Sequence, residues 1–263
     1  MHTVRKVQLF ALLLLSYCFP VALQGQDTAL VSKPRNTSYL ASYWYNAVGL
    51  VASPARWTYE DWSKAGGAIA ITGVLVAMDQ PVSQPFFNWQ TNVGTTFGDV
   101  GYVIGSVPFQ LGLSAAAFGV GAIARSNPLK NFALDNLQAQ VYTGGITWIV
   151  KEIAQRERPN TGNGPYKWHG PFGGTTNASF FSGHSSIAFS TATMIFLYSK
   201  KKWWVGLLSY GVATGVAVSR MQRQAHWASD VVMGAVVGSA VSTFVYRQQE
   251  KRRQVRSLIK PLP

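Results

Sequence analysis

The feature that most constrains the fold of this chain is a series of long apolar runs separated by short polar breaks. None of the runs alternates apolar and polar residues as a half-buried strand does, and all are long for buried strands. An up-and-down bundle of about six helices is the simplest account, so we predict an all-α fold. The runs are Ala65–Met78, Tyr102–Ala124, Phe132–Val150, Ser185–Tyr198, Trp203–Val218 and Val231–Tyr246.

The lengths and flanks of these runs favour a bundle embedded in a membrane. Tyr102–Ala124 has no charged residue over 23 positions, which is enough to cross a bilayer. Trp203–Val218 and Val231–Tyr246 have 16 residues each. As helices they would be roughly 24 Å long, short of the ~30 Å apolar core of a bilayer. Lysines and tryptophans at 200–204 and the basic stretch 247–256 are typical of a cytoplasmic membrane interface. An exported soluble bundle is the alternative.

The first 25 residues have the pattern of a signal peptide. Arg5 and Lys6 form a positive start, Leu9–Leu15 is an apolar centre, and cleavage is expected near Gly25. A retained N-terminal anchor is the alternative. The only cysteine, Cys18, lies inside this segment, so the mature chain would have no disulfide and no thiol chemistry. The expected location is the cell envelope, either in the inner membrane or soluble in the periplasm.

The remaining residues, 26–263, are predicted to form one domain. Residues 26–63 are polar and aromatic and are expected to form a surface segment or an interfacial helix. Residues 64–246 form the bundle, and 247–263 a basic tail. A cleaved signal would start the mature chain outside, and six spans would also end it outside, which conflicts with a cytoplasmic tail. Either the short run Ala65–Met78 does not span, or the bundle is soluble.

The charge balance of the chain points to an anionic partner. Lysine and arginine number 23 against 10 aspartates and glutamates, a formal net charge of +13. Nucleic acid is excluded as the expected partner, because the chain has neither zinc-finger spacing nor a basic helix with interleaved aromatics. An acidic membrane surface or a phosphorylated substrate therefore fits the charge better.

The stretch SRMQRQAHWASD, residues 219–230, places a histidine and a carboxylate beside an arginine. His226 and Asp230 are four residues apart, so they share one face if the last helix begins near His226. A carboxylate there can hold the imidazole Nδ1–H and leave Nε2 as a nucleophile or base. Arg220 offers a fixed fork for phosphate oxygens. Taken alone, an ordinary solvated helix start explains this stretch as well.

The stretch KEIAQRERP ends the third long predicted helix. Lys151 and Arg158 are seven residues apart, which is two helical turns, so we expect them to share a face. Pro159 then stops the helix. The alternative is a solvated helix end with cations placed favourably at its C-terminus.

The stretch FFSGHSS begins the next predicted helix. Ser182 can cap that helix, and Gly183 lets the backbone approach a ligand closely. The free N–H groups there form an anion site, and His184 in the first turn could donate a proton. The alternative is an ordinary helix cap.

In an up-and-down bundle these three stretches meet at one end. No acidic residue occurs between Glu157 and Asp230, so that end is expected to be electropositive and to attract phosphate. A glycine- and proline-rich loop at 158–181 lies beside it, and loops of this length in compact domains are usually functional. His169 in that loop is expected at the surface, and Ser219 as a structural or helping residue.

The three stretches resemble the signature of the type 2 phosphatidic acid phosphatase superfamily. They match as Lys-x6-Arg-Pro, Ser-Gly-His and Ser-Arg-x5-His-x3-Asp, in order, at ten of eleven fixed positions. The superfamily includes membrane lipid phosphate phosphatases, bacterial non-specific acid phosphatases and vanadium haloperoxidases. The motifs cover residues 151–230, and the departure is Phe181, where the family usually has proline; this bears on the rigidity of the loop.

The resemblance implies a role for each motif residue. His226 would attack phosphorus and form a phosphohistidine, Asp230 would orient it, and His184 would protonate the leaving oxygen. The residues that would hold the phosphate oxygens are Lys151, Arg158, Ser182, Gly183 and Arg220. Fixed cations can neutralise phosphate without a metal ion, so we expect no metal and no other cofactor.

The prediction is a metal-independent phosphatase acting on a phosphate monoester or pyrophosphate of a membrane lipid at the outer face of the inner membrane. The alternatives are a soluble periplasmic acid phosphatase of broad specificity, a vanadium haloperoxidase and a non-enzymatic membrane scaffold. The chain is small for a haloperoxidase, and a scaffold would require all three motifs to be accidental. The motifs do not identify the lipid; the loop and residues 26–63 are expected to select it.

Overall fold

The computed structural model describes residues 38–171, 173–174 and 178–259, so the predicted signal peptide, 1–25, and residues 26–37 lie outside the described residues. The described part contains eight α-helices, two short 3-10 helices and no strand, which confirms the all-α prediction. The elements are α2 (Tyr39–Val51), η1 (Ser53–Arg56), α3 (Tyr59–Phe87), α4 (Asn92–Gly105), α5 (Val107–Ile123), α6 (Asn127–Ala154), η2 (Pro159–Thr161), α7 (Gly183–Tyr198), α8 (Trp203–Gln222) and α9 (Ala228–Ile259).

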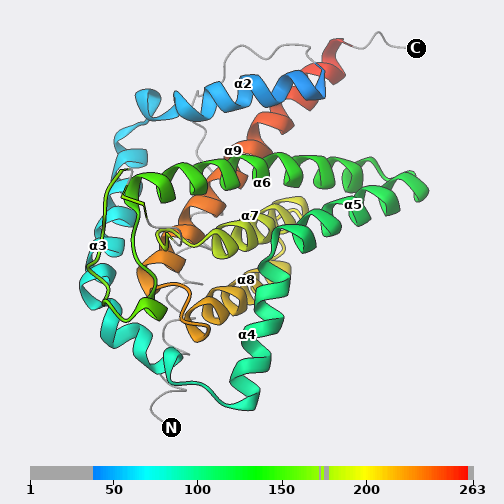
Figure 1. The fold of residues 1–263 in the computed structure, drawn as a ribbon. Coiled ribbons are helices and arrows are strands. Elements are labelled where there is room, and N and C mark those ends of the chain that lie inside the picture. Colours follow the sequence, from blue (N-terminus) through cyan, green and yellow to red (C-terminus); the bar gives the residue numbers. More distant parts are fainter. Residues whose placement is uncertain (1–37, 172, 175–177, 260–263) are drawn as a thin grey trace.

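Helix α7 lies at the centre and packs against α6, α8 and α9, with α3, α4 and α5 outside them (Figure 1). Nearly every residue from Ser185 to Leu197 is buried, because small serine, alanine and threonine side chains let the neighbouring helices approach. The approach is closest at Gly238 of α9, where an added Cβ would lie 2.0 Å from the carbonyl oxygen of Ser186. α7 and α9 therefore form the rigid centre of the bundle.

The predicted helix Tyr102–Ala124 is wrong as a single element. The chain breaks at Ser106, and α4 and α5 are bent by 55° at that point. Pro108 explains the break, because proline lacks an N–H and its ring clashes with the carbonyl four residues earlier. Ser106 caps α5 by accepting from the N–H of Phe109, and the Gln110 side chain donates to the Ile104 carbonyl at 2.8 Å. These bonds satisfy the backbone groups that the break would leave unpaired.

Helix α3 is much longer than the predicted run Ala65–Met78. It begins at a capping box formed by Thr58 and Asp61 and continues through Pro81 and Pro85 to Phe87. Two helices of the described chain, α3 and α9, are long and apolar enough to cross a membrane, and the bent pair α4–α5 could form a third span. A bundle of six spans is therefore not what the lengths and compositions support.

The described part of the predicted interfacial segment, 38–63, contains helix α2, η1 and the start of α3. Helix α2 lies across the upper side of the molecule near the end of α9 (Figure 1). It is held by a buried carboxylate, Asp135 of α6. Tyr39 of α2, Tyr198 of α7 and Arg253 of α9 all donate to it, the last two at 2.6 and 2.9 Å. This polar cluster fastens α2 to the end of the bundle where α9 becomes basic.

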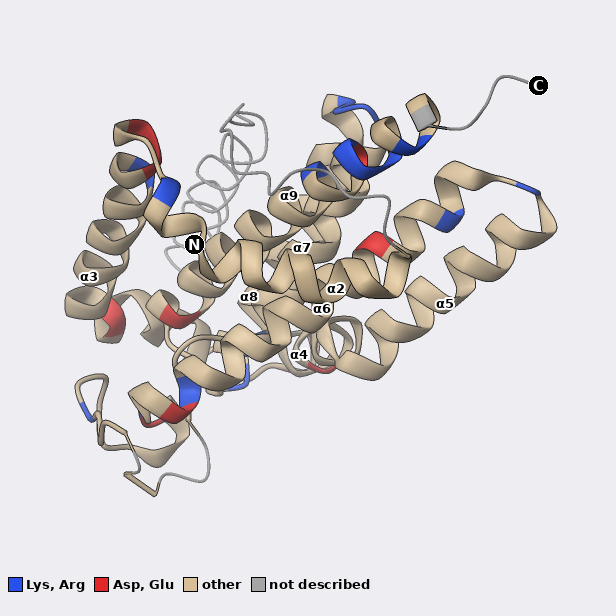
Figure 2. Ribbon diagram, turned by 90° about the horizontal axis from the view of Figure 1, so that it is seen from above, with Lys and Arg blue, Asp and Glu red and all other residues tan. Residues whose placement is uncertain are grey.

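Lysines and arginines gather along the C-terminal part of α9, as the view from above shows (Figure 2). The outer helices instead expose large apolar side chains, among them Ile69 and Val74 on α3, Val103 on α4 and Leu208 on α8. Apolar surface of this extent on several helices is typical of a protein that faces lipid. It agrees with the apolar spans and supports a membrane location.

Candidate active site

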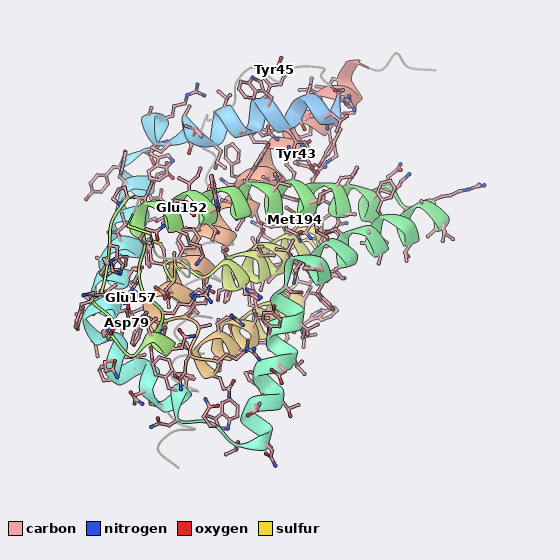
Figure 3. The ribbon with its side chains drawn as sticks, viewed as in Figure 1. Tyr43, Tyr45, Asp79, Glu152, Glu157 and Met194 are labelled. Carbon is pink, nitrogen blue, oxygen red and sulfur yellow. The ribbon has the colours of Figure 1, made fainter. Side chains whose placement is uncertain are left out.

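The three predicted motifs meet at one end of the bundle. The end of α6, the start of α7, the end of α8 and the start of α9 lie there, beside the middle of α3 (Figure 1). Asp79 on α3, Glu152 on α6 and Glu157 in the following loop appear on this side of the molecule (Figure 3). The up-and-down order therefore brings together side chains that are far apart in the sequence.

Lys151 and Arg158 do not share a helix face, so the prediction of a common face was wrong. Helix α6 ends at Ala154, and Gln155 adopts a left-handed conformation with φ 45° that turns the chain. Arg158 then lies outside the helix and precedes η2. The Lys151 Nζ donates to the carbonyls of Ala178 and Ser179 at 2.5 and 3.1 Å. The two cations meet because the loop returns to the helix end, and not because of helical periodicity.

Ser182 caps α7, as predicted, by accepting from the N–H of Ser185. Its own N–H donates to the backbone carbonyl of Asp230 at 3.0 Å, which ties the start of α7 to the start of α9. Gly183 and His184 follow in the first turn of α7. The ring of His184 stacks on Tyr102 of α4 with the ring centroids 5.1 Å apart. Sequence reasoning missed Tyr102, because no motif marks α4.

His226 lies in the turn before α9, and Asp230 lies in the first turn of that helix. The His226 Nδ1 and the nearest Asp230 oxygen are 3.7 Å apart, which is too long for a direct hydrogen bond. Ser179 bridges them: its Oγ lies 3.3 Å from His226 Nδ1 and donates to the same Asp230 oxygen. A relay from Nδ1–H through the serine hydroxyl to the carboxylate leaves His226 Nε2 with its lone pair free. Sequence reasoning missed Ser179, which lies in the loop before the Ser-Gly-His motif.

A buried arginine holds Asp230 from the other side. Arg156 is fully buried and donates to Asp230 and to Asp79 of α3, both at 2.6 Å. Asp79 also accepts from the backbone N–H and the hydroxyl of Ser229, at 2.8 and 2.5 Å. The guanidinium is covered by Trp168, whose ring centroid lies 4.7 Å away. A carboxylate that ends an apolar run is a signal of function in a membrane protein, and Asp79 has this signal in the sequence.

Several donors at this end of the bundle have no partner. Among the described residues, the buried atoms without a hydrogen bond include Arg158 Nε, His184 Nε2, and Arg220 Nε and Nη1. Buried polar groups are rarely left unpaired, because each costs the free energy of its lost hydration. Two arginines that offer only donors, beside a histidine that can donate from one ring nitrogen, fit a ligand that offers only acceptors. A phosphate group is such a ligand.

The charges of these side chains act on one another. Burial, assisted by the charges of Arg220, Arg158 and Lys151, lowers the pKa of His184 to about 3. Burial likewise lowers the pKa of His226 to about 3, so both imidazoles are neutral near pH 7 while the site is empty. Burial also lowers the pKa of Lys151 to about 8. The site therefore contains two neutral imidazoles next to Lys151, Arg158 and Arg220, for which the described residues provide no ion pair.

Two further predicted residues lie outside this constellation. His169 pairs with Glu157 at 2.8 Å in the exposed part of the loop. Ser219 is buried and donates to the carbonyl of Val216 at 2.7 Å, and its side chain faces Gly101 of α4. Phe181, in the position where the family usually has proline, is buried.

Fold and site together define a class of protein: an α-helical bundle of the membrane type with a cation-lined, histidine-containing anion site between its helix ends. Residues 133–254 match the model of the PAP2 superfamily, and this range contains all three motifs. Asp79 and Tyr102 lie outside the matched range.

The chain is also similar to two curated proteins and to one solved structure. The chain is 30% identical over 157 residues to a lipid A 1-phosphatase of Porphyromonas gingivalis, over 59% of this chain and 32% of the relative. It is 37% identical over 68 residues to the bacitracin transport permease protein BcrC of Bacillus licheniformis, over 26% of this chain and 32% of the relative. The chain thus spans about a third of the length of these relatives. The crystal structure of a transmembrane PAP2-type phosphatidylglycerolphosphate phosphatase from Bacillus subtilis has the same fold, with TM-score 0.51 and 19% identity over 75% of this chain and 98% of that one.

Proposed function

We propose that this protein is a metal-independent phosphatase that removes a phosphate from the monoester or pyrophosphate group of a membrane lipid through a phosphohistidine at His226. The observation that carries the proposal is the set of unpartnered buried donors on Arg158, His184 and Arg220. A site of this composition binds a dianion without a metal, because its charge neutralisation comes from side chains that are already in place.

In the first step, the lone pair of His226 Nε2 attacks phosphorus and the bond from phosphorus to the ester oxygen breaks. Lys151, Arg158 and Arg220 neutralise the phosphoryl oxygens. Ser182 and the Gly183 N–H, at the start of α7, also donate hydrogen bonds to these oxygens. The phosphate charge raises the pKa of His184, so that its ring takes up a proton and passes it to the leaving oxygen. The developing charge on His226 is stabilised through Ser179 by Asp230, since both are connected in one relay.

In the second step, water attacks the phosphohistidine. The neutral His184 now takes the proton of that water, the phosphorus–nitrogen bond breaks, and inorganic phosphate leaves. His226 recovers its lone pair, and His184 returns its proton to solvent when the phosphate leaves, so the site returns to its starting state. Every proton and bond in the cycle is accounted for without a further reactant.

The proposed substrates are lipids that present a phosphate on an apolar tail. Apolar outer helices and the relatives that act on lipid A and on phosphatidylglycerolphosphate by name support this class. We also propose that the site faces the periplasm. Lysines 200–202 follow the C-terminal end of α7, and 247–256 lie in the C-terminal part of α9, whereas the motifs lie at the starts of these two helices. Positively charged segments of this kind stay on the cytoplasmic side.

The test is phosphate release by the purified full chain in detergent with EDTA. Wild type and His226→Ala are compared on a panel of lipid phosphates and on p-nitrophenyl phosphate. We expect release that EDTA does not inhibit and that His226→Ala abolishes. Rapid acid-free quenching with radiolabelled substrate should trap a phosphoryl group that is stable in alkali and labile in acid, as a phosphohistidine is.

The outcomes discriminate between the candidate functions. Preference for a lipid phosphate supports the proposal, whereas equal turnover of the soluble ester indicates a phosphatase of broad specificity. Unchanged release by His226→Ala would overturn the assignment of this site.

A further inference from the structure

A groove runs between α4 and α8 on the outer surface of the bundle, with a volume of about 410 Å³. We call it the α4/α8 groove. Its walls are apolar: α4 contributes Phe97, Gly101 and Ile104, and α8 contributes Leu208, Gly211 and Gly215. The α8 wall is open to the surroundings, since Leu208 is 64% exposed. The groove therefore faces the same side as the apolar surface that contacts lipid.

Glycines create the space of the groove. An added Cβ at Gly211 would meet no atom within 4 Å, and one at Gly215 would meet only Phe97, at 3.8 Å. The two helices are thus not pressed together at these positions, unlike at Gly101, where an added Cβ would lie 2.4 Å from Ser219. The missing side chains leave a channel beside a tight helix contact.

One wall of the groove packs against residues of the proposed phosphate site. Val216 lines the groove and also touches Gly105, where an added Cβ would lie 2.5 Å from Val216 and 3.2 Å from His184. Tyr102, the residue after Gly101, stacks on His184, and its ring faces the Arg220 guanidinium at 5.3 Å. The wall of the groove at Gly101 and Val216 is therefore one residue or one contact away from His184 and Arg220.

We propose that the α4/α8 groove binds the acyl or prenyl tail of the lipid whose phosphate lies at His184 and Arg220. The inference rests on the proposed function and assigns a binding site to the apolar tail, the part of the substrate that does not contact the phosphate site. An amphipathic ligand fits this arrangement, because cations and an apolar channel adjoin at one wall. The aromatic ring of Tyr102 lies at the junction, where the polar head ends and the tail begins.

The test fills the groove without disturbing the phosphate site. Gly211→Leu places a side chain into the open channel, and Gly112→Leu on α5 is the matched control, because Gly112 also has no atom within 4 Å of an added Cβ and does not line the groove. With a short-chain lipid phosphate below its micelle concentration, Gly211→Leu should lower kcat/KM by about tenfold, as the loss of one or two methylene contacts does. Turnover of p-nitrophenyl phosphate should be unchanged in both variants.

A second measurement locates the tail directly. A lipid phosphate with a photoreactive diazirine in its tail is bound to His226→Ala, which cannot turn it over, and irradiated. We expect crosslinks within 97–104 and 207–216 that Gly211→Leu abolishes. Crosslinks confined to other segments, or equal effects of Gly211→Leu and Gly112→Leu on the lipid substrate, would overturn the inference. In that case loss of release in His226→Ala would still support the phosphatase, so the two proposals fail separately.

Discussion

Replacing Asp79 by alanine tests how the carboxylate of Asp230 is held. Asp79 and Arg156 have no exposed side-chain surface, and the change removes an ion pair of 2.6 Å together with two hydrogen bonds from Ser229. Breaking a buried pair by removing one partner costs about 3–5 kcal/mol, because the other charge stays buried without compensation. We expect Asp79→Ala to lower the free energy of unfolding by this amount, measured by tryptophan fluorescence during SDS titration in mixed micelles.

A double replacement separates this structural cost from the role in catalysis. Asp79→Leu with Arg156→Met puts apolar side chains in place of the Asp79–Arg156 pair but leaves Asp230 buried without its arginine, so we expect only part of the stability to return. Asp230 then loses its bond from Arg156, so the relay through Ser179 to His226 loses its fixed position. We expect kcat for p-nitrophenyl phosphate to fall about 10²-fold, the cost of a displacement near 1 Å.

The Michaelis constant of the double variant is the internal control. Arg156 donates to carboxylates, Ser229 and a backbone carbonyl, and not to the unpartnered donor set, so KM should change little. A stable double variant with wild-type kcat would refute the positioning role of Arg156. A cost below about 1 kcal/mol for Asp79→Ala would refute the buried pair itself.

Burial lowers the pKa of Lys151 to about 8, so its charge is present below that pH and lost above it; kcat/KM should fall above about pH 8, and Lys151→Arg should remove this decline from the pH–rate profile. Ser179→Ala deletes the hydroxyl between the catalytic histidine and its carboxylate; we expect kcat to fall about 10²-fold while the inhibition constant of vanadate changes less than about twofold. Gly238→Ala would place a Cβ 2.0 Å from the Ser186 carbonyl and should cost about 1–3 kcal/mol of unfolding free energy, whereas Gly144→Ala, which meets no atom, should not destabilise the protein.

The apolar runs predicted the helical class and the position of most helices. A long apolar segment without the alternation of a strand can be buried with its backbone hydrogen bonds satisfied mainly as a helix. Their ends were less predictable. The run 102–124 has no charge to mark a break, and only Pro108 at the start of α5 explains why it bends. Conversely, Pro81 and Pro85 suggest an early end for α3, but the helix continues to Phe87. A proline at a helix start and one inside a helix look alike in a single sequence, since packing decides which occurs.

The motif residues could be located from spacing, but their partners could not. The side chains of Arg156 and Ser179 act through contacts that the loop between α6 and α7 creates, and no period relates them to the helices. Asp79 is 77 residues from Arg156 in the chain. Its signal was a lone carboxylate at the end of an apolar run, which suggests a function without naming the partner. The four-residue spacing predicted a direct contact between His226 and Asp230, but the two side chains are connected through the hydroxyl of Ser179.

These partners explain how the site can stay electropositive although it contains an acid. Asp230 is the one acidic residue among the motif positions, and left alone it would neutralise the nearest cation. Arg156 prevents this, because it takes one Asp230 oxygen while Trp227 and Ser179 donate to the other. Asp79 accepts a hydrogen bond from the other terminal nitrogen of the Arg156 guanidinium, Nη2. Two buried acids and one buried arginine therefore form a closed unit, and Lys151, Arg158 and Arg220 remain available to a phosphate. The unpartnered donors follow from this separation: Asp230, Asp79 and Arg156 satisfy one another, whereas Arg158 and Arg220 keep buried donors without a partner among the described residues.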